Sequence, residues 1–143
     1  MAEIELHLTL PRDARYVPVL RNVARSLMHS LDVPEESVDD VAIALSEACG
    51  NVIRHARGTD QYGVVLTVAS QTCEIEVCDL GPGFDRATMD AAQRGDIIDQ
   101  IEGAEDGRGL RLLRALMDDL QFVREEDTTR VRLFKRWDAV GLG

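Results

Sequence analysis

Residues 38–57 read VDDVAIALSEACGNVIRHAR, and the rest of the chain is organised around this stretch. Its apolar residues recur every three or four positions, which is the spacing of a helix that packs one face onto a core. A second stripe of the same helix carries four polar side chains: Glu47, Asn51, Arg54 and His55. On an isolated helix such a stripe is usually a solvated face. Two glycine-bearing segments downstream, 79–83 and 107–109, favour a functional interpretation.

The composition predicts one soluble domain that spans residues 1–143. Hydrophobic residues make up 45% of the chain and charged residues 29%. The net charge of −10 opposes binding to nucleic acid or to an anionic membrane, so we expect neither partner. No apolar run approaches the roughly 20 residues that span a bilayer, and the first residues do not resemble a signal peptide. We therefore expect a cytoplasmic protein.

The three cysteines lack the spacing of a metal site. Cys49 lies on the apolar face of the central helix, whereas Cys73 and Cys78 lie in a segment with strand-like alternation. We expect three buried structural thiols in a reducing compartment.

The first half of the chain predicts strands around two helices. Alternation predicts a strand over 3–10 that Pro11 ends, and helical spacing follows from about residue 13 or 16 to residue 31. The central helix is expected to begin after Pro34 and to stop near Gly58. Two further strands, over 61–70 and 72–79, are joined by a tight connection near Ser70 and Gln71.

The second half begins with a segment of weak periodicity, 86–106, for which we expect a short helix and a long loop. Helical spacing returns over 110–120, and two strand patterns follow over 121–123 and 129–137. This order predicts an α+β fold, a two-layer sandwich with helices on one face of a mixed, mainly antiparallel sheet.

Asp79, Gly81 and Gly83 stand where the strand over 72–79 ends. A carboxylate there can accept a hydrogen bond from an exocyclic amine, and glycines let a flat ligand lie close to the backbone. A plain turn is the alternative, because Pro82-Gly83 is ordinary turn chemistry.

Gly107 and Gly109 precede the helix over 110–120. The N-terminus of a helix presents free N–H groups and the positive end of the helix dipole, which suit a phosphate. Arg108 and Arg111 could add phosphate contacts, although a tight turn with solvated arginines stays open. The pattern matches neither the dinucleotide fingerprint nor a P-loop.

Glu47 and Asn51 offer chemistry that fits a phosphate ligand. A carboxamide oxygen can help to hold Mg²⁺, which usually keeps several waters and shares substrate phosphates. A carboxylate one turn away can take the proton of an attacking hydroxyl.

Together these three segments resemble the small anti-sigma-factor serine kinases. These are single-domain members of the Bergerat-fold ATPases, relatives of histidine-kinase catalytic domains and of the DNA gyrase ATPase domain. The resemblance rests on three ordered boxes: Ser46-Glu47-Ala48-x-x-Asn51-x-x-x-His55-Ala56, Asp79-x-Gly81-x-Gly83-Phe84 and Gly107-x-Gly109-Leu110. It extends over nearly the whole chain and implies the Bergerat ATP-binding fold, with ATP and Mg²⁺ as cofactors.

The resemblance also implies roles for individual residues. Glu47 matches the catalytic base and Asn51 the Mg²⁺ ligand, while Arg54 matches a position near the phosphates. Asp79 matches the acceptor of the adenine amino group, with Gly81 and Gly83 beside the base. The box Gly107-Arg108-Gly109-Leu110 matches the segment that wraps the phosphates at the end of an ATP lid, here residues 86–106. Thr129 matches a threonine that reaches adenine from a late strand.

The family acts by partner switching, so the resemblance implies three protein partners: a sigma factor, an anti-anti-sigma protein as substrate, and a second copy in a homodimer. Two alternatives stay open. Glu105 and Asp106 put two negative charges beside the phosphate turn, which favours a nucleotide-binding module without catalysis. The other alternative is a partner-switching kinase whose target is not a sigma factor.

Overall fold

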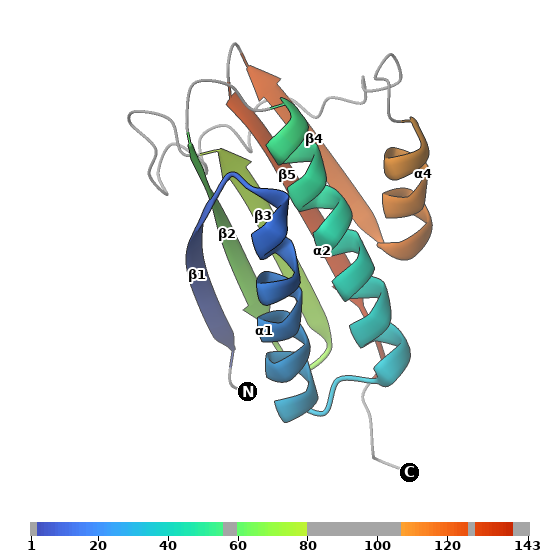
Figure 1. Cartoon of the computed structure of the whole chain (residues 1–143). Helices are drawn as coiled ribbons and strands as arrows, with labels where there is room; N and C mark the ends of the chain where they lie inside the picture. The colour runs from blue at the N-terminus through green and yellow to red at the C-terminus, as the bar shows by residue number, and fades with distance from the viewer. Residues whose placement is uncertain (1–2, 56–59, 80–106, 126–127, 139–143) are drawn as a thin grey trace.

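The computed structural model describes residues 3–55, 60–79, 107–125 and 128–138. Figure 1 shows two layers, in which helices cover one face of a five-stranded sheet. The strands are β1 (Ile4–Pro11), β2 (Gln61–Val68), β3 (Thr72–Asp79), β4 (Asp119–Glu125) and β5 (Thr128–Arg136). The helices are the 3-10 turn η1 (Ala14–Tyr16) and the α-helices α1 (Val17–Ser30), α2 (Glu35–His55) and α4 (Gly107–Leu116).

The sheet has the strand order β1-β2-β3-β5-β4, and each of these neighbouring pairs is antiparallel. The prediction of helices on one face of a mainly antiparallel sheet is therefore confirmed, with no parallel pair among the described strands. β5 lies between β3 and β4, so the last strand of the chain contacts the strand that ends at Asp79. Because β3 and β5 are antiparallel, the last residues of β3 lie beside the first residues of β5 at one end of the sheet.

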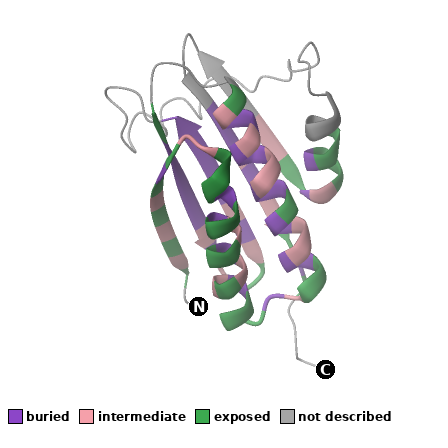
Figure 2. Ribbon diagram, viewed as in Figure 1, coloured by how far each residue is buried: buried purple, intermediate pink, exposed green. Residues whose placement is uncertain are grey.

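The core lies between the sheet and the helices. Alternate residues of β2, β3 and β5 are almost fully buried against α1 and α2, as the purple inner surfaces in Figure 2 indicate. On α2 the apolar positions Val38, Val41, Leu45 and Val52 are each 0% exposed. This is the face that the helical spacing of residues 38–57 predicts.

The three predicted buried thiols are confirmed. Cys49, Cys73 and Cys78 are all free and buried. Burial raises the pKa of Cys49 and of Cys73 to about 12, because a thiolate loses its hydration inside the protein.

The predicted boundaries needed three corrections. Pro11 belongs to β1, because this strand lies at the edge of the sheet and Pro11 pairs with Gln61 as its last residue. β2 stops at Val68, since Ala69 N donates to Thr72 O and the hairpin turns there.

The third correction concerns the helix predicted over 110–120. α4 instead begins at Gly107 and ends at Leu116, and Leu120 belongs to β4. Asp118 N donates to Phe134 O at 2.8 Å, which draws the chain into the sheet. The apolar spacing of Leu116, Met117 and Leu120 suits a helix, but Leu120 packs against the core from a strand.

No helix in the described part of the chain is both long enough and apolar enough to cross a membrane.

Candidate active site

The polar stripe of α2 lies at the C-terminal half of that helix. Asn51 is buried, with 6% of its surface exposed, whereas Glu47 one turn earlier is partly exposed and Arg54 is exposed. Arg54 Nη2 donates to Asn51 Oδ1 at 3.4 Å. The carboxamide oxygen therefore already faces a positive charge. His55 is the last residue of α2, and its side chain lies outside the described atoms.

Gly50 gives Arg54 the room to fold back along the helix. A Cβ atom at position 50 would lie 3.3 Å from Arg54 Nη1. A side chain there would require the guanidinium to shift by a small amount.

Asp79 and Thr129 come together although 50 residues separate them in sequence. Cys78 pairs with Arg130, so the next residue outward on β3 is Asp79 and the next on β5 is Thr129. Asp79 is only 2% exposed, and its Oδ1 atom is sealed from solvent. The two residues to which the resemblance assigns contacts with adenine thus lie on neighbouring strands at the same end of the sheet. The Thr129 side chain lies outside the described atoms.

Tyr62 connects this edge to α2. It pairs with Asp79 across the β2–β3 ladder and is 0% exposed. Its hydroxyl lies against the thiol of Cys49, which stands two residues before Asn51. Burial raises the pKa of Tyr62, and the neighbouring Cys49 adds to the rise. A buried contact therefore links α2 to β2 beside the end of β3. The sequence did not reveal it, because Tyr62 has the pattern of an ordinary strand residue.

The end of β3 is also buried on the face of the sheet that points away from the helices. Arg130 is 3% exposed and lies beside Cys78. Burial raises the pKa of Cys78 to about 11, and the Arg130 guanidinium opposes part of that rise.

α4 begins with Gly107, and its first turn contains Gly109. In Figure 1 this N-terminus lies at the same end of the molecule as the C-terminus of α2 and the tip of β3. The free backbone N–H groups of α4 and the positive end of its helix dipole, which suit a phosphate, therefore lie at the end of the molecule where α2 and β3 end. The side chains of Arg108 and Leu110 lie outside the described atoms, as do Gly81, Gly83 and the segment predicted as the lid, 86–106.

The described residues fit a magnesium–nucleotide pair. Mg²⁺ commonly takes one or two protein oxygens and completes its shell with waters and phosphates. The buried Asn51 offers one such oxygen, and its contact with Arg54 indicates that it accepts from a cation. Asp79 supplies an acceptor at the edge where a purine amino group would lie.

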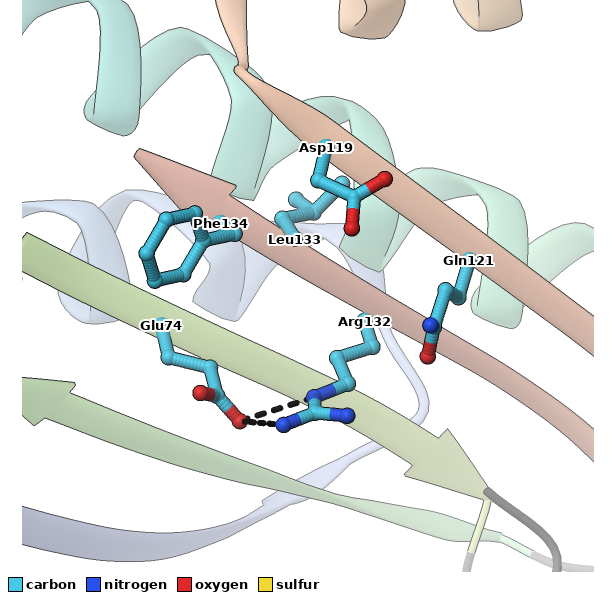
Figure 3. Close-up of a pocket in the computed structure, with 6 residues that line it drawn as sticks. All are labelled: Glu74, Asp119, Gln121, Arg132, Leu133 and Phe134. Atoms are coloured by element: carbon cyan, nitrogen blue, oxygen red, sulfur yellow. Dashed lines mark hydrogen bonds and ion pairs between the residues drawn. The ribbon is translucent and has the colours of Figure 1, made fainter. Parts of the chain in front are cut away.

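A hollow on the other face of the sheet is a different feature. It has a volume of about 240 Å³. In Figure 3 the side chains of Glu74 and Arg132 lie on the face that the helices leave uncovered, where Arg132 binds Glu74 by contacts of 2.8 and 2.6 Å. The lining residues are Glu74, Asp119, Gln121, Arg132, Leu133 and Phe134. None of them is a predicted site residue.

Comparison with protein families identifies the domain. The family model of the histidine kinase-like ATPase domain matches residues 10–135. The chain belongs to that family. As an ATPase domain it binds ATP.

Individual relatives support the same family membership. The chain is 30% identical over 129 residues to the serine-protein kinase RsbW of Bacillus cereus (strain AH820), covering 87% of this chain and 81% of that protein. The RsbW kinase of Bacillus mycoides (strain KBAB4) gives the same identity and coverage.

Two solved structures share the fold. The crystal structure of the RsbU and RsbW domains of Rv1364c from Mycobacterium tuberculosis superposes with a TM-score of 0.66 at 20% identity, covering 93% of this chain and 32% of that one. The SiaB–SiaC complex of Pseudomonas aeruginosa gives a TM-score of 0.59 at 15% identity, covering 91% and 88%.

Proposed function

We propose that this chain is an ATP-dependent serine/threonine protein kinase and anti-sigma factor of the RsbW type. It binds ATP with Mg²⁺, sequesters a sigma factor and phosphorylates an anti-anti-sigma protein in the cytoplasm, acting as a homodimer. This proposal is supported by the buried Asn51 on α2 and the buried Asp79 where β3 ends, two elements that end at the same end of the fold, in a chain 30% identical to RsbW kinases.

Each residue has a defined task in the proposed reaction. Asp79 accepts a hydrogen bond from the adenine amino group, and the first N–H groups of α4 bind phosphate oxygens. Asn51 Oδ1 would hold Mg²⁺, and the ion would offset the negative charge of the phosphates. Glu47 accepts the proton of the substrate serine hydroxyl. The serine oxygen then bonds to the γ-phosphorus while the bond to the β-phosphate oxygen breaks, releasing ADP.

The direct test is phosphoryl transfer from radiolabelled ATP to the anti-anti-sigma protein of the same organism, with Mg²⁺ present. Glu47→Gln keeps the size of the side chain but removes the base. We expect transfer to fall by about 10²–10⁴-fold, with ADP affinity within about twofold of the unmodified protein.

Glu36→Gln is the matched control, since Glu36 is exposed in the first turn of the same helix. It should leave transfer unchanged. Undiminished transfer by Glu47→Gln would remove Glu47 from the reaction. Failure of the unmodified protein to bind ATP would end the proposal as a whole.

A second candidate is a nucleotide-binding anti-sigma module without catalysis. Glu105 and Asp106 favour it, because two carboxylates beside the phosphate turn weaken the attraction for a polyanion. This candidate predicts tight sigma-factor binding with bound ATP that remains intact after long incubation. Mass spectrometry of the retained nucleotide separates the two, since the kinase converts ATP to ADP when its substrate protein is added.

A further inference from the structure

Lys135 is the only lysine in the chain, where all other basic side chains of the Lys and Arg type are arginines. It lies near the end of β5, with Val131 and Leu133 on the same side of that strand. Both of these neighbours are 0% exposed beneath the helices. The single lysine therefore points from the sheet into the helix layer.

The ammonium group joins two helices. Lys135 Nζ donates to Asp40 Oδ2 of α2 at 3.0 Å and to Leu116 O of α4 at 2.7 Å. The Lys135 side chain is 14% exposed, so water competes weakly for these contacts. Leu116 ends α4, and its carbonyl lacks a partner within the helix and lies at the negative end of the helix dipole. A compact ammonium with three donors suits this two-partner site.

Further contacts lie close to the same end of α4. Asp118 N donates to Phe134 O, and its carboxylate Oδ2 accepts from Arg136 N at 2.6 Å. Met117 is buried, whereas Arg111 and Leu112, closer to the start of the helix, are exposed. Leu113, in the middle of the helix, is 0% exposed, so α4 is held by this core contact together with the contacts at its C-terminal end.

This anchor lies at the far end of two antiparallel helices from the candidate active site (Figure 1). Along α2, Asp40 precedes Asn51 by about 16 Å, and along α4 the distance from Leu116 back to Gly107 is about 14 Å. A tilt of α4 by about 4° around Leu116 would displace Gly107 by about 1 Å. A displacement of that size weakens the hydrogen bonds from the backbone N–H groups to a phosphate, and losing one bond to a charged group lowers affinity by about tenfold or more.

We propose that Lys135 is a positioning residue for the nucleotide, which fixes the angle between α2 and α4 and so sets the spacing between Asn51 and the phosphate-binding turn of α4. This inference rests on the proposed function, since it assumes that the N-terminus of α4 binds phosphate. It predicts that loss of Lys135 lowers the affinity for the phosphates and does not change the affinity for the purine. The reason is that Asp79, the proposed purine contact, lies on β3 and not on either helix.

The test compares ATP with adenosine by calorimetry, using Lys135→Met, which keeps the length of the side chain and removes its charge. We expect the affinity for ATP to fall about tenfold or more, with adenosine affinity within about twofold of the unmodified protein. Arg25→Met is the matched control. It removes the 2.9 Å ion pair of Arg25 with Asp39, which joins α2 to α1 instead of α4. It should leave the ratio of the two affinities unchanged.

A general loss of stability would weaken both ligands together or act equally in the control variant, and either result would overturn the inference. Asp40→Asn retains an acceptor for Lys135 and should stay close to the unmodified protein in its ATP-to-adenosine ratio. A loss as large as that of Lys135→Met would contradict the positioning role of the ammonium.

A measurement on the unmodified protein avoids any folding failure of the variants. Lysine labelled with the heavy nitrogen isotope gives one side-chain ammonium resonance, because Lys135 is the only lysine. We expect ATP to shift this resonance and adenosine to leave it in place. A resonance that ATP does not move overturns the inference. Absence of ATP binding in the same titration would instead refute the proposed function, so the two failures are distinguishable.

Discussion

Asp79→Asn provides the sharpest test of how this protein selects adenine. The substitution preserves shape at a side chain that is 2% exposed, so it removes charge with little change in packing. In the proposed complex the carboxylate accepts from the adenine amino group. A hydrogen bond to a charged group contributes about 1.5–3 kcal/mol, and losing it corresponds to about 10- to 150-fold weaker ATP binding. We expect the upper part of this range, since Oδ1 is sealed from water and the local dielectric is low.

The substitution also changes which base fits. An amide can turn its N–H donors toward the ligand, where a carboxylate offers acceptors alone. Guanine presents a carbonyl oxygen at the position of the adenine amino group, so Asp79→Asn should bind GTP more tightly while it binds ATP more weakly. Calorimetric titration with both nucleotides measures the crossover.

Asp119→Asn serves as the control, because it makes the same chemical change on the helix-free face of the sheet. It should leave both affinities unaltered. If Asp79→Asn retains full ATP affinity while circular dichroism reports an intact fold, Asp79 does not contact adenine. An equal loss of ATP and GTP would point to a distorted pocket, and the reasoning about base selection would be wrong.

Two further predictions concern stability. Asp32, just after the end of α1, has a φ of 59°, and the next residue, Val33, donates its N–H to Met28 O. Glycine adopts this left-handed conformation without strain, so Asp32→Gly should raise the free energy of unfolding by about 0.5–1 kcal/mol. Urea unfolding followed by the fluorescence of Trp137, the single tryptophan, measures this, and a destabilised variant would contradict it. The three buried thiols have folded pKa values of about 11 to 12 against an ordinary value of 9.0, so their stabilising contribution is complete below about pH 9 and is lost as pH rises through the folded pKa. Urea titrations should give a slope of up to about 1.4 kcal/mol per pH unit for each thiol, and Cys73→Ala should reduce it; an unchanged slope would exclude that thiol.

The helices and most strands could be predicted because each buries one regular stripe of apolar side chains. Leu20, Ala24 and Met28 on α1 are 0–1% exposed, as their spacing requires. The end of α4 could not be predicted in this way. Its apolar residues continue at helical spacing to Leu120, and only the contact of Asp118 with Phe134, a residue 16 positions later, decides that the chain turns into a strand.

The candidate site also contains residues that local spacing predicts and residues that only the folded chain brings together. Glu47, Asn51 and Arg54 share a helix, so their spacing alone predicts that they project together. Asp79 and Thr129 become neighbours only because β5 inserts between β3 and β4, and no local pattern specifies this strand order. The resemblance to a known family supplied that juxtaposition, and the Cys78–Arg130 pair gives its physical basis.

The contacts of Lys135 could not be predicted from local sequence patterns. Its partner Asp40 is 95 residues away, and each residue taken alone reads as an ordinary charge, one on a helix and one on a strand. Periodicity specifies which face of an element is buried, but it does not specify which charged side chains meet when those faces pack. The one sequence signal was compositional, a single lysine in a chain that otherwise uses arginine. A guanidinium at this position would present a planar fork, whereas the carboxylate and the helix-end carbonyl here converge on one point, and that geometry favours an ammonium.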